Sequence, residues 1–181
     1  MQWFIPVILG VACLTGCGKK KTLKDVTDTE MRSAYQLTED RKSGVIKMDS
    51  SSRQGDVQLN GINYRYVIKR MPDESLPKAT DDDGNSYVDN RIELDIFSGN
   101  RKFFSRVFLK SNFSGMVDSS FVKKGILEGL VFDKVKDGKM DFSVSISYPQ
   151  TDMYQSLMIE ISENGGMAVK KDESMDGSDV E

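Results

Sequence analysis

A cysteine that follows a short apolar run is the residue whose surroundings point most directly to a chemical modification. The junction Leu14–Cys17 ends an apolar run that starts at Trp3. This run matches the roughly 7–15-residue core of a secretory signal and falls short of the about 20 residues that a spanning helix needs. We therefore predict cleavage before Cys17, a diacylglycerol on its thiol and an acyl chain on its new amine, as in bacterial lipoproteins.

The charges around the apolar run leave one alternative open. Met1 and Gln2 supply no basic side chain, whereas Lys19, Lys20 and Lys21 follow the run directly. Under the positive-inside rule, this order also suits a short uncleaved anchor with a cytoplasmic body. The length of the run and the junction at Cys17 favour the lipoprotein, which we expect to be attached to a membrane by its lipid chains.

Hard oxygen ligands gather in one predicted loop. Asp81, Asp83 and Asn85 lie within five residues, and Asp89 follows nearby. Calcium prefers such ligands. The spacing does not match an EF-hand, because the glycine is misplaced and no glutamate stands at the twelfth position. The alternatives are a metal site formed by these four residues and a solvated Asp-Gly turn.

Other side chains suggest enzymatic chemistry, and each has a simpler structural explanation. Carboxylates on predicted strands, namely Glu93, Asp95, Glu128 and Asp133, could cleave a glycoside as an acid and base pair, but strand carboxylates are ordinarily the solvated face of a sheet. Ser119 or Ser120 with Lys123 or Lys124 loosely matches a Ser-Lys pair, yet a capped helical turn explains the same residues. We expect the protein not to be an enzyme.

Aromatic side chains offer a further candidate, a platform for a sugar or a peptide. The residues concerned are Tyr64, Tyr66, Tyr87, Phe103, Phe104, Phe108 and Phe113. Core packing explains most of them, although an exposed subset would suit a ligand cleft.

Composition excludes several classes of site. The chain has no histidine, and both of its cysteines precede residue 18. The mature body therefore has no Ser-His-Asp site, no Cys/His zinc site and no His- or Cys-ligated haem, and we expect no cofactor. The 25 basic and 28 acidic residues give a net charge of −3, which does not favour a nucleic acid partner.

The elements that must position these residues are mainly β-strands joined by tight turns. Asn60-Gly61, Asp137-Gly138 and Asn164-Gly165 each separate two alternating apolar segments, which predicts three hairpins. Residues 140–148 alternate most cleanly, so that one face is apolar and the other solvated. Residues 103–110 are apolar on both faces, as is typical of a central strand. Residues 118–125 predict a single capped helical turn.

Roughly eight short strands with one short helix predict an all-β protein, either an antiparallel β-sandwich or a partly closed barrel. We divide the chain into a signal peptide over 1–16, the lipidated Cys17 with a polar tether over 17–55, a β domain over 56–171 and a disordered acidic tail over 172–181.

Several segments of the predicted β domain resemble a known group of proteins. The segments are Pro72–Pro77, Tyr87–Asn90 and Gly125–Asp133, joined by Phe103–Phe104 and Pro149–Asp152. Over about residues 57–171, the chain resembles single-domain lipoproteins of the Bacteroidetes that form a domain-of-unknown-function family. The resemblance implies a lipoprotein with one domain and a Gram-negative host, and it carries no activity.

The resemblance also bears on location. Surface lipoproteins of that phylum tend to have acidic residues after the lipidated cysteine, whereas Lys19, Lys20 and Lys21 stand there in this chain. We therefore expect an outer-membrane lipoprotein that faces the periplasm. Its expected role is non-enzymatic binding of a protein or a cell-envelope component, and the alternative is a small-ligand or calcium-dependent binding domain.

Overall fold

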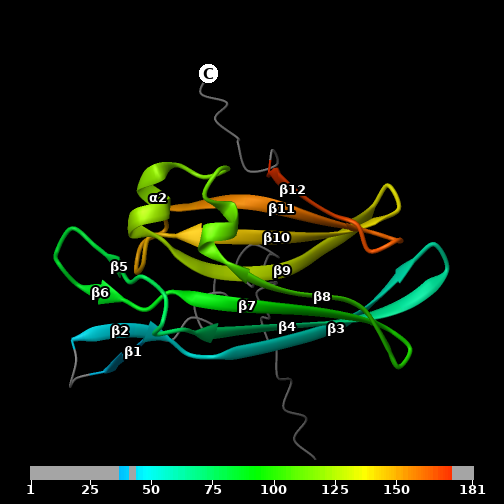
Figure 1. Ribbon diagram of the computed structural model, residues 1–181, viewed down its shortest axis with the longest axis horizontal. Helices are drawn as coiled ribbons and strands as arrows, with labels where there is room; N and C mark the ends of the chain where they lie inside the picture. Colours follow the sequence, from blue (N-terminus) through cyan, green and yellow to red (C-terminus); the bar gives the residue numbers. More distant parts are fainter. Residues whose placement is uncertain (1–36, 41–43, 173–181) are drawn as a thin grey trace, which may run out of the picture. The chain divides into compact units, whose positions relative to one another are not determined.

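The computed structural model describes residues 37–40 and 44–172 of the chain, and their strands form three sheets of four strands each (Figure 1). One sheet has the order β3-β4-β7-β8 and a second the order β12-β11-β10-β9, with antiparallel neighbours throughout. The third has the order β1-β2-β6-β5. The strands are β1 (Leu37–Asp40), β2 (Val45–Met48), β3 (Ser51–Leu59), β4 (Ile62–Pro72), β5 (Ala79–Thr80), β6 (Ser86–Tyr87), β7 (Asn90–Ser98), β8 (Arg101–Leu109), β9 (Ile126–Lys136), β10 (Lys139–Ser147), β11 (Tyr154–Ser162) and β12 (Met167–Lys171).

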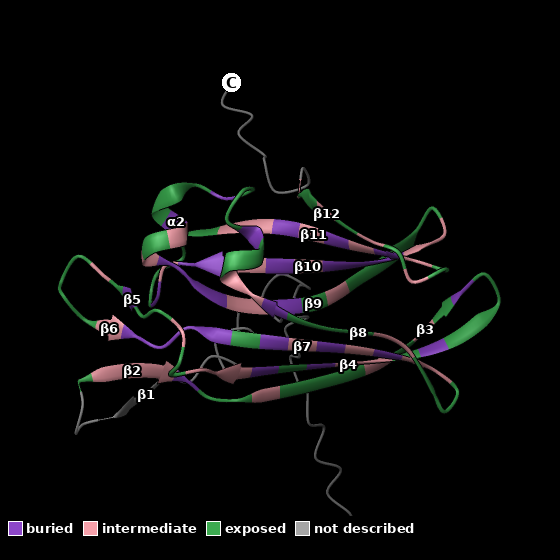
Figure 2. Ribbon diagram, in the orientation of Figure 1, coloured by how far each residue is buried: buried purple, intermediate pink, exposed green. Residues whose placement is uncertain are grey.

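The first two sheets pack face to face and enclose the main core, which confirms the predicted all-β sandwich (Figure 2). Apolar side chains at alternate positions of β7 and β10 point into this core and are at most 1% exposed. They are Ile92, Leu94 and Ile96 on β7, and Met140, Phe142, Val144 and Ile146 on β10. Tyr66 joins the two layers, because its ring lies 5.2 Å from that of Phe132 and 5.8 Å from that of Phe142.

The three predicted hairpins are confirmed at their turns. Asn60 and Gly61 both have positive φ angles, of 49° and 79°, and Asp137 and Gly138 have angles of 51° and 70°. Two successive positive φ angles are the requirement of the two-residue turn that matches the twist of a hairpin. These turns connect β3 with β4 and β9 with β10, while Gly165 lies between β11 and β12.

The predicted helical turn is helix α2 (Ser119–Lys124), which follows the 3-10 turn η1 (Lys110–Phe113). Asp118 occupies the N-cap position but does not cap the helix with its side chain. Instead, Gln155 of β11 donates a hydrogen bond to the Asp118 carboxylate and accepts one from its backbone N–H. This pair of bonds fixes α2 to the start of β11.

The third sheet was not predicted from the sequence. It is held by parallel pairing of β2 with β6 and by a small core of Met48, Ala79, Tyr87 and Ile126. Strand β2 of this sheet, and the first half of β3 of the neighbouring sandwich sheet, lie within residues 17–55, the segment expected to be a tether.

Two predictions about individual strands are wrong. The strand over 103–110 is the edge strand β8 rather than a central strand, and Val107 on it is 49% exposed. Phe103 lies at a bulge of this strand and packs against the main core, its ring 5.0 Å from that of Tyr64. On β10, the polar face is not uniformly solvated, because Asp141 and Ser147 are only 5% and 3% exposed.

Among the described residues, no helix is long and apolar enough to cross a membrane.

Candidate functional site

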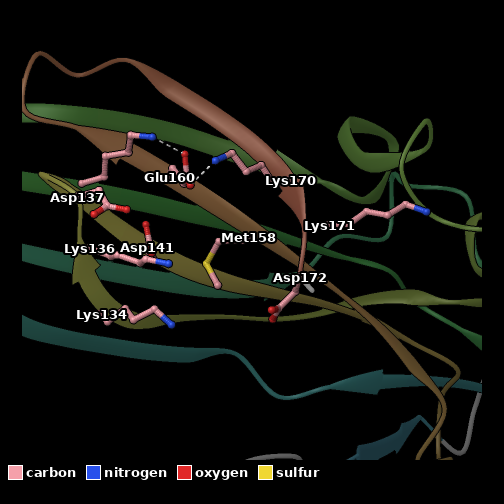
Figure 3. Close-up of a pocket in the computed structure, with 10 residues that line it drawn as sticks. Lys134, Lys136, Asp137, Asp141, Met158, Glu160, Lys170, Lys171 and Asp172 are labelled. Carbon is pink, nitrogen blue, oxygen red and sulfur yellow. Dashed lines mark hydrogen bonds and ion pairs between the residues drawn. The ribbon is translucent and has the colours of Figure 1, made fainter. Parts of the chain in front are cut away.

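A groove of about 590 Å³ lies on the outer face of the β12-β11-β10-β9 sheet, towards the turn between β9 and β10 (Figure 3). This volume falls within the range of about 300–1,000 Å³ that is usual for ligand pockets. We call it the lysine–carboxylate groove, and it is lined by Lys134, Lys136, Asp137, Lys139, Asp141, Met158, Glu160, Lys170, Lys171 and Asp172. Side chains of both charges therefore share one concave surface.

Glu160 on β11 bridges the strands on either side of it. Lys139 of β10 donates a hydrogen bond of 2.8 Å to one carboxylate oxygen, and Lys170 of β12 donates one of 2.6 Å to the other. These are the two dashed lines in Figure 3. The hydrogen bond from Lys139, followed by that from Lys170, keeps the pKa of Glu160 below its usual value. Glu160 is thus ionised and both of its oxygens are occupied.

Asp141 on β10 is the unusual residue of the groove. It stands opposite Glu160 on one side and Lys134 on the other, and it is 5% exposed. Its Oδ1 atom is buried and has no hydrogen-bond partner among the described residues. Burial, followed by the charge of Glu160, raises the pKa of the Asp141 carboxyl above its usual value.

A buried hydrogen-bond acceptor without a donor destabilises the fold. Leaving a buried acceptor without a donor costs about 1–3 kcal/mol, and more if the group is charged. The lysines closest to Asp141 along the sheet already bind other carboxylates, since Lys139 binds Glu160 and Lys134 binds Asp133 at 3.0 Å. The groove therefore offers a free acceptor to a ligand that carries a hydrogen-bond donor.

The sequence did not identify this groove. The alternation of residues 140–148 places Asp141 on the polar face correctly, but it gives no sign that this position is buried. Its cross-strand neighbours Lys134 and Glu160 are separated from it by turns, and the three residues come together only through the strand register.

A second groove of about 550 Å³ adjoins the first, and Lys171 and Asp172 line both. It lies beside Phe121 of α2 and the start of β11. Its exposed apolar residues are Met116, Met153 and Tyr154, which are 38%, 53% and 46% exposed. Large exposed apolar side chains that cluster in this way are typical of contact surfaces.

The predicted metal loop is organised by Asp81. Its carboxylate accepts hydrogen bonds from the backbone N–H groups of Asp83 and Asn85, the side-chain amide of Asn85 and the hydroxyl of Tyr87, at 2.8–3.0 Å. The amide of Asn85, as the largest cause, lowers the pKa of Asp81. Burial and the hydrogen bond to Asp81 raise the pKa of Tyr87 to about 12. Asp81 therefore holds the loop together with protein donors.

Asp89, the fourth predicted metal ligand, serves a different set of contacts. Its Oδ1 atom accepts the backbone N–H groups of Asn90 and Leu127, both at 2.8 Å, and its Oδ2 atom lies 3.2 Å from the ammonium of Lys110. Within the described residues, no three His, Cys, Asp or Glu side chains form a group that could hold a metal ion. The structure thus does not bring the four predicted ligands together, and calcium binding stays a prediction.

The contacts of Asp89 belong to a buried polar cluster that joins the segments of the family resemblance. Asn90 donates its side-chain amide to the carbonyl of Leu127 at 2.9 Å, and Arg70 donates to the carbonyls of Glu128 and Asp49 at 3.0 and 2.9 Å. These bonds link β4 and β7 of one sheet to β9 of the other. They fix the sheets to each other at the end near β2 and β6.

The remaining candidates occupy structural positions. Asp95 binds Lys102 and Ser105, Asp133 binds Lys134, Glu128 accepts from Ser147, and Lys124 of α2 binds Asp82. Glu93 lies on β7 of the other sheet. No two of the predicted acid and base carboxylates are hydrogen-bonded to each other in the described part of the chain.

The aromatic residues pack in or against the cores, as the sequence led us to expect for most of them. Tyr64, Tyr87, Phe108 and Phe113 are at most 5% exposed, and Tyr66, Phe103 and Phe104 pack against the core from its margins. Cys17, the predicted lipidation site, lies outside the described residues.

Comparison with known proteins gives a family and no activity. A family model described as a domain of unknown function, DUF4738, matches residues 30–169. The match extends the resemblance, which starts at about residue 57, towards the N-terminus and includes β1, β2 and β3. No curated protein matches the chain.

Proposed function

The chain belongs to the DUF4738 family, a domain of unknown function, and from that premise we propose that it is a non-enzymatic, lipid-anchored binding protein of the cell envelope. The ligand is a polar component of the envelope, and it occupies the lysine–carboxylate groove. The protein belongs to the outer membrane of a Bacteroidetes bacterium and faces the periplasm.

The observation that carries the binding role is the buried carboxylate of Asp141 in a groove of ligand size. Asp141 is 5% exposed and its Oδ1 atom accepts no hydrogen bond within the described residues. Where no ligand is involved, a carboxylate oxygen in a folded protein is ordinarily either solvated or hydrogen-bonded to another protein group. A ligand in the groove that donates a hydrogen bond to the Asp141 carboxylate would supply the partner that the described residues do not.

The lipid anchor is supported by the sequence alone, through the junction Leu14–Cys17 and the short apolar run before it. Replacing the cysteine tests it directly. Cys17→Ala should release the protein from the membrane fraction or leave it as an unprocessed precursor, because no thiol remains for the lipid. Mass spectrometry of the wild-type protein that finds an unmodified Met1 would contradict the assignment.

The binding role is tested by blocking the groove. Met158 lines the groove, and Met158→Trp should fill it, whereas Val131→Trp places the same side chain on the same face of the sheet outside the groove. The full chain, purified in a neutral detergent, is heated with and without the dialysable fraction of an envelope extract. A ligand that binds only the native state raises the Tm by mass action.

We expect the extract to raise the Tm of the wild type and of Val131→Trp, and to leave Met158→Trp unchanged. An equal shift in all three proteins would place the ligand elsewhere, for instance in the second groove. The absence of any shift in the wild type would remove the support for a small envelope ligand. Parallel samples with and without calcium test the calcium-dependent alternative.

A further inference from the structure

We propose that the lysine–carboxylate groove recognises a small zwitterion of dipeptide size, whose ammonium group binds Asp141 and whose carboxylate binds Lys136. This inference rests on the proposed binding function and names the chemistry of the ligand. It follows from three features of the groove, namely the unpaired buried acceptor, the engaged lysines around it and the free lysine at the rim.

The Asp141 carboxylate is a hydrogen-bond acceptor that a cationic donor would suit. Asp141 lines the groove, and its Oδ1 atom has no hydrogen-bond partner within the described residues. It also forms no ion pair among the described residues, whereas Glu160, which stands opposite it on β11, holds two lysines. An ammonium group on a ligand would supply both a hydrogen-bond donor and a counter-charge to Asp141.

The lysines next to Asp141 are already committed. Lys139 and Lys170 both bind Glu160, at 2.8 and 2.6 Å, and Lys134 binds Asp133 at 3.0 Å. These three lysines could bind Asp141 only by breaking one of their pairs. An ammonium group on a ligand would satisfy Asp141 and leave the three pairs intact.

The rim supplies the opposite charge. Lys136 is exposed, lines the groove, and makes no ion pair or hydrogen bond with the described residues. It pairs directly with Lys139 across the β9–β10 hairpin, so its side chain projects on the same face as that of Asp141. Its ammonium is available for the anionic end of a ligand.

The distance between the two positions sets the size of the ligand. Lys136 lies one strand across and two residues along from Asp141. With about 4.8 Å between strands and about 3.3 Å per residue, the two backbone positions are about 8 Å apart. An extended dipeptide spans about 7 Å, so its two termini match this separation. The groove of about 590 Å³ has room for its side chains.

Three matched probes separate the contributions of the two termini. Glycylglycine carries both charges, N-acetylglycylglycine lacks the ammonium, and glycylglycinamide lacks the carboxylate. We expect isothermal titration calorimetry of the full chain in detergent at neutral pH to show binding of glycylglycine. Each blocked probe should bind roughly 10-fold more weakly or worse, the loss expected for one charge-assisted hydrogen bond.

Two variants and a control connect the probes to the residues. Asp141→Asn keeps the shape of the side chain and should lose glycylglycine binding by roughly 10-fold or more, and Lys136→Gln should do the same. Asp56→Asn makes the same chemical change on an exposed position of β3 and should bind like the wild type. Circular dichroism of each variant establishes that it is folded.

The proposal is overturned if glycylglycine does not bind the wild type, if either blocked probe binds as well as glycylglycine, or if folded Asp141→Asn retains full affinity. These results are distinct from a failure of the binding function. Stabilisation by envelope extract that disappears in Met158→Trp would keep the groove as a binding site and reject only the zwitterion. If neither the envelope extract nor glycylglycine binds the wild type, both the binding function and the zwitterion are rejected.

Discussion

At the scale of single residues, Asp141 makes the stability of the fold depend on pH in a defined direction. Burial raises the pKa of its carboxyl above the usual value of 3.8. The native state therefore holds this proton more firmly than the unfolded state, and stability falls as pH rises from that value through the raised pKa. Asp141→Asn removes the penalty, so we expect the variant to be more stable than the wild type at pH 7.

The comparison of Asp141→Asn with the wild type by urea unfolding at several pH values checks this prediction. The difference in free energy of unfolding should be small below the unfolded pKa and grow towards neutral pH. Acids with a lowered pKa, such as Asp95 beside Ser105 and Lys102, contribute stability to the fold that is lost as pH falls. This loss is the same in both proteins. A difference that is constant with pH would show that ionisation of Asp141 is not its cause.

Asp89 illustrates the opposite kind of buried carboxylate, one whose partners are all present. Its side chain is 4% exposed and that of Lys110 is 11% exposed. Asp89→Ala would leave the lysine ammonium buried without its counter-ion and two backbone N–H groups without their acceptor. We expect the free energy of unfolding to fall by about 3–5 kcal/mol.

Chemical denaturation of the variant measures this loss. Asp83→Ala deletes the same group from an exposed position of the loop between β5 and β6, and it should change stability by no more than about 0.5 kcal/mol. Equal losses in the two variants would mean that the ion pair with Lys110 contributes nothing beyond a surface charge.

At the scale of the element, strand β10 has one face in the core and one in the groove. Val144 is 1% exposed, whereas Ser145 points to the outer face opposite Ser156. Val144→Asp would bury an unpaired charge and should cost more than about 4 kcal/mol, while Ser145→Asp should cost about 0.5 kcal/mol. Denaturant unfolding of the two variants checks the register, and similar losses would show that it is shifted.

The sequence predicts those strands that are defined by their own residues and turns. Positive-φ turns at Asn60-Gly61 and Asp137-Gly138, together with alternation along β10, define hairpins without any knowledge of the rest of the chain. Strands β5 and β6 have two residues each, too few for a period, and they exist only because β2 pairs with β6. The edge position of β8 likewise depends on the order of strands rather than on its composition.

The candidate site is predicted less well than the fold, for the same reason. The acidic loop at Asp81 is conspicuous in the sequence, but its carboxylate is used by the loop itself. Asp141 is inconspicuous, because one aspartate on an alternating strand is ordinary. Its significance arises from the burial and missing donor that the neighbouring strands create.

At the scale of the whole molecule, the proposed anchor and the charges beside it predict where the protein faces. Lys19, Lys20 and Lys21 follow the predicted lipidation site, where surface lipoproteins of the Bacteroidetes that the chain resembles tend to have acidic residues. Protease added to intact cells should therefore spare the protein, and it should digest the protein once the outer membrane is permeabilised. Immunoblotting of the treated cells measures both outcomes.

Replacing the three lysines with aspartate should move at least part of the protein to the cell surface. A soluble periplasmic protein serves as the control for membrane integrity. Digestion of the wild type in intact cells would place the groove outside the cell and change the source of its ligand to the surroundings.

The third sheet is held by contacts between segments that lie far apart in the sequence, and this should affect the order in which parts of the molecule fold. The sandwich sheets are assembled largely from hairpins between neighbours in the sequence, whereas the pairing of Val45 with Ser86 must close a long stretch of chain. Closing a longer loop costs more entropy, so this sheet is expected to form after the hairpins and to open before them. The amide of Val88, which donates to the carbonyl of Ile46, should then exchange with deuterium earlier than the amides of β10. We thus expect the third sheet to open while the sheet that carries the groove stays intact, so that local opening at that end of the sandwich would not disturb the groove.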